Sequence, residues 1–564
     1  MIRQGVYKSA KGFSAAIYAP KASLCRIRLY RHGSDEVTDT FSMEKDAEHE
    51  GFFVASFKTC ADEYAFECDG SLTADPYATQ IAGRSSFFDT ASKARYVLPK
   101  KAVQFKSDVK VRHEFNDLII YKLHVRGFTM DESSCVAHPG TFKGVTEKLR
   151  YIKGLGVNAV LLMPCYEFDE VMPAGYRGKA KPNVWGYGAR ANYFAPKQSF
   201  ASDGDNPAAE FIAMVKAFHR AGIEVLMEMF FSEETPIIMA LEALRYWREQ
   251  FHIDGFRLVG GGLTNKMAAT DPMLNGVRLL SADDGFMTVT RRFLKGDENK
   301  LGEFAQAFKD IGENTGKINF ITDHDSFTLA DLYSYDVKHN ETNLESNRDG
   351  REINYSWNCG VEGETSNKKI LALRKLMCKN AMTTLLLSQA TPMLMAGDEF
   401  MCTHKGNNNP YCCDNSEGWV VWNRNAAARE LTDYVRRLIK LRTEHRVFSN
   451  NIELKGTDYI YKGNPDISYH GVKAWYPDFG YYSRTLGVML NGDYALIDKN
   501  RTDETYYLAF NMHWEEHEFG LPVSGKTKFE LILATESDVK YQGGRTVKIP
   551  PRSIAVFKKK PGEV

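Results

Sequence analysis

The sequence has 564 residues, which at roughly 150 residues per domain predicts several domains and excludes a small single module. Lys plus Arg and Asp plus Glu number 72 each, so no basic excess is present to neutralise phosphates, and nucleic acid is not expected as a partner. Hydrophobic residues make up 43% and charged residues 26%, which is typical of a globular protein rather than a disordered or fibrous one.

The N-terminal segment MIRQGVYKSAKGFSAAIY contains no apolar core of a signal peptide, and no later stretch reaches the roughly 18 apolar residues that span a membrane. We therefore expect no membrane partner and a cytoplasmic location. The 10 cysteines are scattered without the paired spacing of a metal site, so we expect reduced and mostly buried thiols. No cofactor and no metal are expected.

Residues 1–112 contain short alternating segments such as SAAIYAP, CRIRLYRH and FFVASFK, separated by turns rich in Gly, Asp and Ser. This pattern predicts an N-terminal β-sandwich domain. From Leu118 the pattern changes, because apolar runs of strand length, such as LIIYKLHV and NAVLLMP, alternate with helical runs such as EFIAMVKAFHRAG. Strands joined by crossover helices predict a parallel (β/α)8 TIM barrel over residues 113–448.

After residue 448, the segments HGVKAWYP, YYLAFNMHW, KFELILA and RSIAVFKK again resemble short strands. Residues 449–564 are therefore predicted to form a C-terminal antiparallel β domain, arranged as a sandwich. The predicted fold class is α/β, with the barrel between two all-β domains.

The barrel segments contain specific phrases, among them YKLHVRGFT, VWGYGARANYFAP, FHIDGFR, INFITDHDSFTL and TPMLMAGDEF. Together and in this order they resemble the α-amylase superfamily of glycoside hydrolases, and within it the isoamylase, pullulanase and glycogen-debranching branch. Members of that branch cleave α-1,6 branch points of glycogen or starch. The segment DGSLTADPYA resembles the starch-binding-type sandwich that precedes the barrel in this branch, which makes an α-glucan the implied ligand of residues 1–112.

A retaining glycosidase needs two carboxyl groups roughly 5 Å apart, one as nucleophile and one as acid. The resemblance places Val259 at the nucleophile position, where the family pattern DGFRFD ends in Asp. It places Ala282 at the acid position, in the segment DPMLNGVRLLSADDG. No residue is therefore predicted to be catalytic, and the chain is expected to be a pseudoenzyme rather than an enzyme.

The third barrel strand departs from the family as well, because EMFFSE stands where the family has DVVYNH. Ser232 replaces an Asn that binds calcium in some relatives, and two loops that build the cleft are shortened. An active enzyme would have to use displaced carboxylates, for which the candidates are Glu228, Glu233, Asp283 and Asp284.

Several sugar-binding positions of the family are kept. The resemblance predicts carbohydrate contacts for Trp185, Tyr187, Arg257, His324 and Asp325. Each also has a structural alternative. Arg257 could be a barrel-interior arginine paired with Glu228 or Asp325, and the two aromatic residues could simply pack in a loop. His324 and Asp325 could be kept for hydrogen bonds to neighbouring loops.

These observations predict a catalytically deficient isoamylase-like protein that binds α-glucan, such as glycogen or a branched malto-oligosaccharide, or that supports an active debranching enzyme as its partner. One alternative is an active α-1,6-glucan hydrolase or glucanotransferase, and another is a scaffold without carbohydrate affinity. We expect the N-terminal sandwich to bind glucan more strongly than the barrel does. Exposed aromatic side chains decide between a binder and a scaffold, since sugars stack on them.

Overall fold

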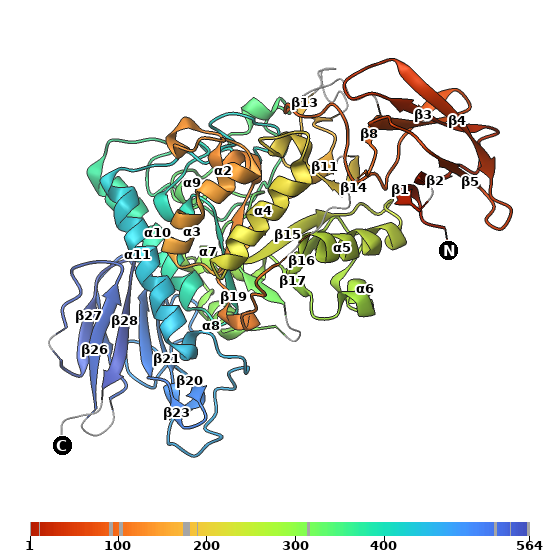
Figure 1. Ribbon diagram of the computed structural model, residues 1–564. Coiled ribbons are helices and arrows are strands. Elements are labelled where there is room, and N and C mark those ends of the chain that lie inside the picture. Colours follow the sequence, from red (N-terminus) through yellow and green to blue (C-terminus); the bar gives the residue numbers. More distant parts are fainter. Residues whose placement is uncertain are drawn as a thin grey trace.

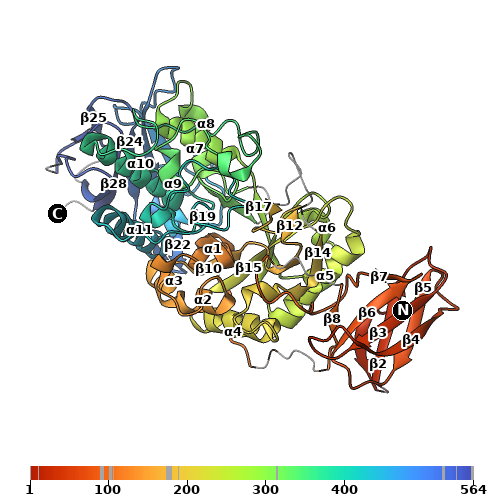
Figure 2. The ribbon, with the colours of Figure 1, turned by 90° about the horizontal axis from the view of Figure 1, so that it is seen from above.

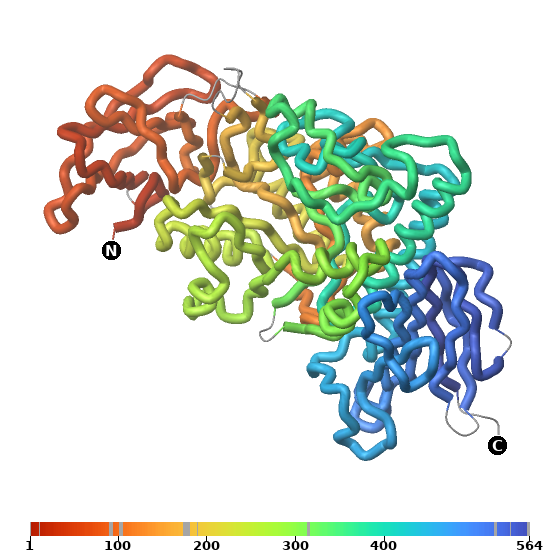
Figure 3. Tube along the Cα trace, turned by 180° about the vertical axis from the view of Figure 1, so that it is seen from behind, coloured from red at the N-terminus to blue at the C-terminus, as the bar shows by residue number. Residues whose placement is uncertain are grey.

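The computed structural model contains an N-terminal sheet, a central barrel and a C-terminal sheet, with the two sheets at opposite ends of the barrel (Figures 1 and 2). It describes residues 2–10, 12–88, 94–100, 105, 107–172, 181–188, 190–312, 316–523, 527–541 and 543–560. The first and last described residues are far apart, one beside each sheet (Figure 3).

The N-terminal sheet is antiparallel. Its strands are β1 (Gly5–Ser9), β2 (Gly12–Tyr18), β3 (Cys25–Tyr30), β4 (Val37–Lys45), β5 (Phe52–Phe57), β6 (Glu63–Cys68), β7 (Ser71–Thr73) and β8 (Tyr96–Val97). Strand β4 pairs with β3 along its length but with β5 only at Glu44 and Lys45, so the sheet folds over at β4 into two layers. Alternating side chains such as Phe13, Ile27 and Phe66 fill the space between the layers.

The central barrel is a closed cycle of parallel strands. In the described residues it contains β9 (Ile120–Leu123), β10 (Ala159–Leu162), β15 (Glu224–Phe230), β16 (Gly255–Val259), β17 (Arg278–Ala282), β18 (Lys317–Asn319) and β19 (Thr391–Met395). Strand β19 pairs with β9 and closes the ring. The predicted barrel between two β-rich regions is confirmed, with these seven strands in the described part of the ring.

Helices cover the outside of the barrel (Figure 1). They are α1 (Val125–Thr129), α2 (Phe142–Glu147), α3 (Leu149–Leu155), α4 (Pro207–Arg220), α5 (Ile237–Phe251), α6 (Asn265–Ala268), α7 (Gly285–Lys295), α8 (Leu301–Lys309), α9 (Leu329–Leu332), α10 (Lys368–Leu387) and α11 (Ala426–Glu444). Their apolar sides pack on the outward side chains of the strands, such as Tyr121, Val160 and Met227. Among the described helices, none has the length and apolar character that crossing a membrane requires.

The remaining short strands of the barrel region lie in the loops that follow β10. They are β11 (Tyr166–Phe168), β12 (Val171–Met172), β13 (Lys181–Pro182) and β14 (Ala191–Pro196). Strand β11 pairs with β14, and β12 pairs with β13. These hairpins extend the molecule toward the N-terminal sheet (Figure 1), and the segment between β13 and β14 carries Trp185 and Tyr187.

The C-terminal strands are β20 (Ile467–His470), β21 (Thr485–Leu490), β22 (Leu496–Asp498), β23 (Arg501–Thr502), β24 (Tyr506–Asn511), β25 (His517–Gly520), β26 (Lys528–Ala534), β27 (Thr546–Ile549) and β28 (Ser553–Lys560). Five of them form one antiparallel sheet in the order β20-β21-β24-β28-β26. The pair β25–β27 packs on that sheet through Phe519, Val547 and Ile549, which makes a second layer. The exact domain boundaries at residues 112 and 448 stay a prediction.

Candidate functional site

The parity of the barrel strands selects the side chains that point into the ring. Leu118 and Ile120 face the interior of the barrel. Lys122 stands two residues after Ile120 on β9 and therefore also points inward. In the same way Leu226 faces the interior from β15, and Glu228 follows it. Polar side chains therefore gather above an apolar inner layer, toward the carboxyl ends of the strands, which is where barrel proteins place their sites.

Two cations and two carboxylates meet there. Nζ of Lys122 lies 2.8 Å from Oε1 of Glu228 and 2.6 Å from Oδ1 of Asp323. Nη1 of Arg257 lies 2.9 Å from Oε1 of Glu228 and 2.7 Å from Oδ2 of Asp323. The register pairs Glu228 directly with Arg257 across β15 and β16, which explains their contact. Lys122, Glu228, Arg257 and Asp323 form what we call the ion cluster.

The ion cluster keeps both acids ionised. Burial alone would raise the pKa of Glu228, but the charges of Lys122 and Arg257 outweigh burial and hold that pKa below its usual value. Burial would also raise the pKa of Asp323, but the charges of Arg257 and Lys122 hold that pKa well below its usual range. With two positive and two negative charges, the cluster is neutral. Neither carboxyl is therefore poised to carry a proton for acid catalysis.

Two aromatic side chains and one imidazole cover the ion cluster. The hydroxyl of Tyr187 donates a hydrogen bond to Oε2 of Glu228, and the Tyr187 ring stacks on His324 at a centroid distance of 4.7 Å. Trp185 meets His324 edge-on at 5.2 Å, is only 5% exposed and packs with Met163 and Val184. The structure thus brings Trp185, Tyr187, Arg257 and His324 together, and most of the Trp185 surface is engaged in packing.

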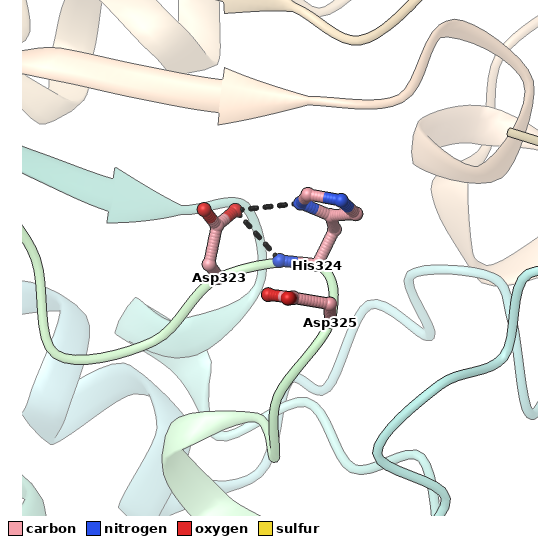
Figure 4. Close-up of side chains that lie close together, drawn as sticks. All are labelled: Asp323, His324 and Asp325. Atoms are coloured by element: carbon pink, nitrogen blue, oxygen red, sulfur yellow. Dashed lines mark hydrogen bonds and ion pairs between the residues drawn. The ribbon is translucent and has the colours of Figure 1, made fainter. Parts of the chain in front are cut away.

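Asp325 lies close to Asp323 and His324, but its carboxylate pairs with a different cation from those of the ion cluster. Figure 4 shows Asp323 turned toward the His324 ring and backbone, and Asp325 on the following turn of the loop. The Asp325 carboxylate is 42% exposed and pairs with Arg351 at 3.0 Å. Arg351 also binds Asp284. The expected alternative partner of Arg257 was Glu228 or Asp325, and the structure shows Glu228 together with Asp323.

Asp323, His324 and Asp325 offer ligand atoms within 4.8 Å of one another, which is a spacing that suits a metal ion. Oδ1 of Asp323, however, already lies 2.6 Å from the Lys122 ammonium, and Nδ1 of His324 lies 2.7 Å from the same nitrogen. A divalent cation would have to sit beside Lys122 and Arg257, which repel it. These residues therefore do not fit a metal centre.

The resemblance predicts the nucleophile at Val259 and the acid at Ala282, and these two residues end the adjacent strands β16 and β17. The displaced carboxylates considered as alternatives do not converge on a common point at these strand ends. Asp283 is exposed and accepts the amide of Gly285 at 2.7 Å, while Glu233 is an exposed loop residue after β15. Of the displaced candidates, only Glu228 belongs to the ion cluster.

Sequence reasoning missed Lys122 and Asp323 as members of the site. Lys122 stands in the middle of the apolar run LIIYKLHV, and a charged residue at an inward position of a buried strand is a usable signal. Asp323 precedes His324 in the phrase TDHD, in which the resemblance points to the second Asp, Asp325. Its contacts depend on how the loop after β18 turns, which the sequence alone does not reveal.

Comparison with known proteins agrees with this architecture. The family model for the catalytic domain of α-amylase matches residues 85–235. Isoamylase 1 of Arabidopsis thaliana is 28% identical over 97% of this chain and 85% of its own. The glycogen operon protein GlgX homologue of Mycobacterium tuberculosis is 30% identical over 80% of this chain and 77% of its own.

Solved structures show the same fold. The pullulanase of Paenibacillus barengoltzii in complex with maltohexaose and α-cyclodextrin superposes with a TM-score of 0.73 at 20% identity, over 99% of this chain and 95% of that one. A pullulanase of Anoxybacillus complexed with maltotetraose gives 0.72 at 19% identity, over 98% and 87%.

The closed parallel barrel, the match to the α-amylase catalytic domain and the 30% identity to the GlgX homologue together place the chain in the α-amylase class. Within it, the chain belongs to the isoamylase and glycogen-debranching branch.

Proposed function

We propose that this chain is a catalytically deficient member of its branch, which binds α-glucan without hydrolysing it or supports an active debranching enzyme. The observation that carries this proposal is that both carboxylate oxygens of Glu228 already have partners within the protein. One of its oxygens contacts Lys122 and Arg257, and the other accepts the hydroxyl of Tyr187. A carboxylate held in this way has no free oxygen directed at a substrate, so it cannot serve as a nucleophile.

Val259 and Ala282 support the same proposal. In the family pattern these positions supply the nucleophile and the acid, and an aliphatic side chain provides neither a lone pair nor a proton. The ion cluster adds a physical obstacle, because a sugar entering the ring would have to displace charges that already satisfy one another. Any sugar binding that the barrel retains is therefore confined to its mouth, at the carboxyl ends of the strands.

We propose a weak sugar contact at that mouth. The stacked rings of Tyr187 and His324 supply an aromatic surface, and Asp325 supplies an exposed carboxylate that accepts sugar hydroxyls. Arg257 and Trp185 take part by holding this surface in place, Arg257 through Glu228 and Trp185 through its edge contact with His324. Their assignment as carbohydrate-binding residues is part of the proposal.

The test is a pair of measurements on the full chain. We expect no release of reducing ends from glycogen, amylopectin or pullulan above a mock purification, and retardation of the same protein in native gels that contain glycogen. Release that disappears with Glu228→Gln would contradict the proposed loss of catalysis. Absence of retardation, together with absence of hydrolysis, would favour the scaffold without carbohydrate affinity.

A second candidate function has one specific observation in its favour. Asp284 and Asp325 both bind Nη2 of Arg351, at 3.3 and 3.0 Å, so two exposed carboxylates lie close together near the barrel mouth. Such a pair resembles the requirement of a retaining hydrolase. Both carboxylates, however, contact the same guanidinium, whereas that mechanism needs one of them to face the anomeric carbon and the other to face the leaving oxygen. Hydrolysis that disappears with Asp284→Asn but survives Glu228→Gln would establish this function instead.

A further inference from the structure

Exposed aromatic side chains are concentrated in one part of the described chain. Of ten exposed tyrosine, tryptophan and phenylalanine side chains, eight lie between residues 459 and 514. The other two are Tyr18 and Phe88, so the N-terminal sheet contributes little aromatic surface. Because sugars stack on exposed aromatic rings, this distribution favours the C-terminal region as a glucan-binding surface, while binding by the N-terminal sheet stays a prediction.

Most of these eight exposed aromatic side chains belong to the loop of residues 471–484, which joins β20 to β21 next to α8 (Figure 1). It carries Trp475, Tyr476, Phe479, Tyr481 and Tyr482. We call these five residues together with Trp514 the aromatic platform. Tyr476 is 73% exposed, Tyr482 72% and Trp514 57%. The loop contributes one exposed aliphatic side chain, Val472, so the surface consists of rings rather than of the branched side chains of a typical core.

The loop backbone is held in a defined shape. The amide of Gly471 donates to the carbonyl of Tyr476 at 3.0 Å, and the amide of Trp475 donates to Nδ1 of His470 at 2.8 Å. At its far end, the amide of Asn299 donates to the carbonyl of Tyr481 at 2.8 Å. Because the backbone is tied at both ends, binding does not have to order the loop first.

Arg484 joins the loop to Trp514 and to the barrel. Its Nη1 donates to the carbonyl of Tyr482 at 2.8 Å, its Nε donates to the carbonyl of Gly296 at 2.7 Å, and its guanidinium lies 5.1 Å from the centre of the Trp514 ring. His513 stacks on Trp514 at 4.0 Å. The Trp514 ring is thus exposed and yet held in place, and it presents apolar area that does not pack in the core.

We propose that the aromatic platform is the principal α-glucan-binding surface of this protein. Aromatic faces stack on the apolar faces of pyranose rings. Lys473 and Asp478 are exposed in the same loop and offer charged groups to sugar hydroxyls. This inference rests on the proposed function, since it assigns a place to the glucan binding stated there. A second protein is the competing occupant, and the experiment distinguishes it.

The experiment is affinity electrophoresis of the full chain in native gels with increasing glycogen. We expect the Tyr476→Ala/Tyr482→Ala variant to lose about fivefold in apparent affinity per ring, which corresponds to about 1 kcal/mol each. Two matched controls are Tyr18→Ala, on the N-terminal sheet and 55% exposed, and Tyr461→Ala, 92% exposed but outside the loop. Both controls should migrate as the unmodified chain does. Melting temperatures check that all variants fold.

The outcomes separate the platform from the proposed function. If the unmodified chain and the double variant are retarded equally, the chain binds glucan but not through the aromatic platform. If only Tyr18→Ala reduces retardation, the N-terminal sheet is the binding surface. If no chain is retarded by glycogen, glucan binding itself fails, and the aromatic surface is then assigned to contact with a protein.

Discussion

Lys122 and Glu228 meet inside the barrel with their charged atoms 2.8 Å apart, and neither side chain has measurable exposure. A buried pair of this kind holds together through mutual neutralisation, because each charge alone would be strongly disfavoured away from water. In a barrel whose relatives act on glucans, this pair turns the inner end of the site into part of the core.

Replacing Lys122 with Met should destabilise the fold strongly. The substitution leaves Glu228 and Asp323 with one cation between them, and breaking a buried pair in this way costs about 3–5 kcal/mol. Urea denaturation followed by tryptophan fluorescence measures the loss. The matched control is Lys153→Met on the exposed face of α3, which should change stability by less than about 0.5 kcal/mol. Equal losses in the two variants would show that the ion cluster contributes little.

Restoring the family's two acids should not restore hydrolysis. In the Val259→Asp/Ala282→Glu variant, the new carboxylates would stand at the ends of β16 and β17, next to a cluster whose cations are already satisfied by Glu228 and Asp323. The shortened loops predicted from the sequence also leave the reacting sugar poorly enclosed. Reducing-end release from pullulan is the measurement. Turnover in this variant above the unmodified chain would mean that the mouth still accepts a substrate.

The stability of the fold should depend on pH through Asp398. Burial raises the pKa of this carboxyl to about 7, although the hydroxyl of Thr322 and the amide of Leu329 act in the opposite direction. Between its ordinary pKa and about 7 the folded chain holds a proton that the unfolded chain has released. The stabilisation is therefore complete at low pH and is lost as pH rises through about 7.

The Asp398→Asn variant removes this dependence. Relative to the unmodified chain, it should become more stable as pH increases from 4 to 7, by up to about 4 kcal/mol. Urea midpoints at several pH values give the difference, and Asp433→Asn on the exposed face of α11 serves as the control. A difference that stays constant over this range would refute the assignment.

Cys25 and Cys68 should form a disulfide under oxidising conditions. They are direct partners across β3 and β6, and their sulfur atoms lie 2.7 Å apart. The neighbouring pair is hydrogen-bonded, from the amide of Asp69 to the carbonyl of Leu24, so the cysteines occupy a position without such bonds, where side chains approach most closely. Burial raises the pKa of Cys25 to about 12, which makes the less buried Cys68 the attacking thiol.

Glutathione disulfide is the oxidant for the test. Cys68 displaces one glutathione to form a mixed disulfide, and Cys25 then displaces the second, which leaves the protein lighter by two hydrogen atoms and releases two molecules of glutathione. Intact-mass spectrometry follows both steps. The Cys25→Ser variant should stop at the mixed disulfide. Two cysteines that both remain alkylatable after prolonged incubation would argue against the pair.

The barrel and both β-rich regions could be predicted from the sequence because each depends on local periodicity. The alternation of LIIYKLHV and NAVLLMP with helical runs is independent of distant contacts. The ion cluster could not be predicted in this way, because the closure of the ring unites residues up to 201 positions apart in it, from Lys122 to Asp323. Exposure was equally inaccessible, because the aromatic residues of segment 471–484 give no local sign of whether their rings point inward or outward.

The position of the two sheets at opposite ends of the barrel has a consequence for attachment to a large particle. If the C-terminal end of the molecule anchors the chain, the N-terminal sheet lies at the other end and stays free of the anchoring contact (Figures 2 and 3). On such a particle, an array of chains would present the N-terminal sheets as its outer layer.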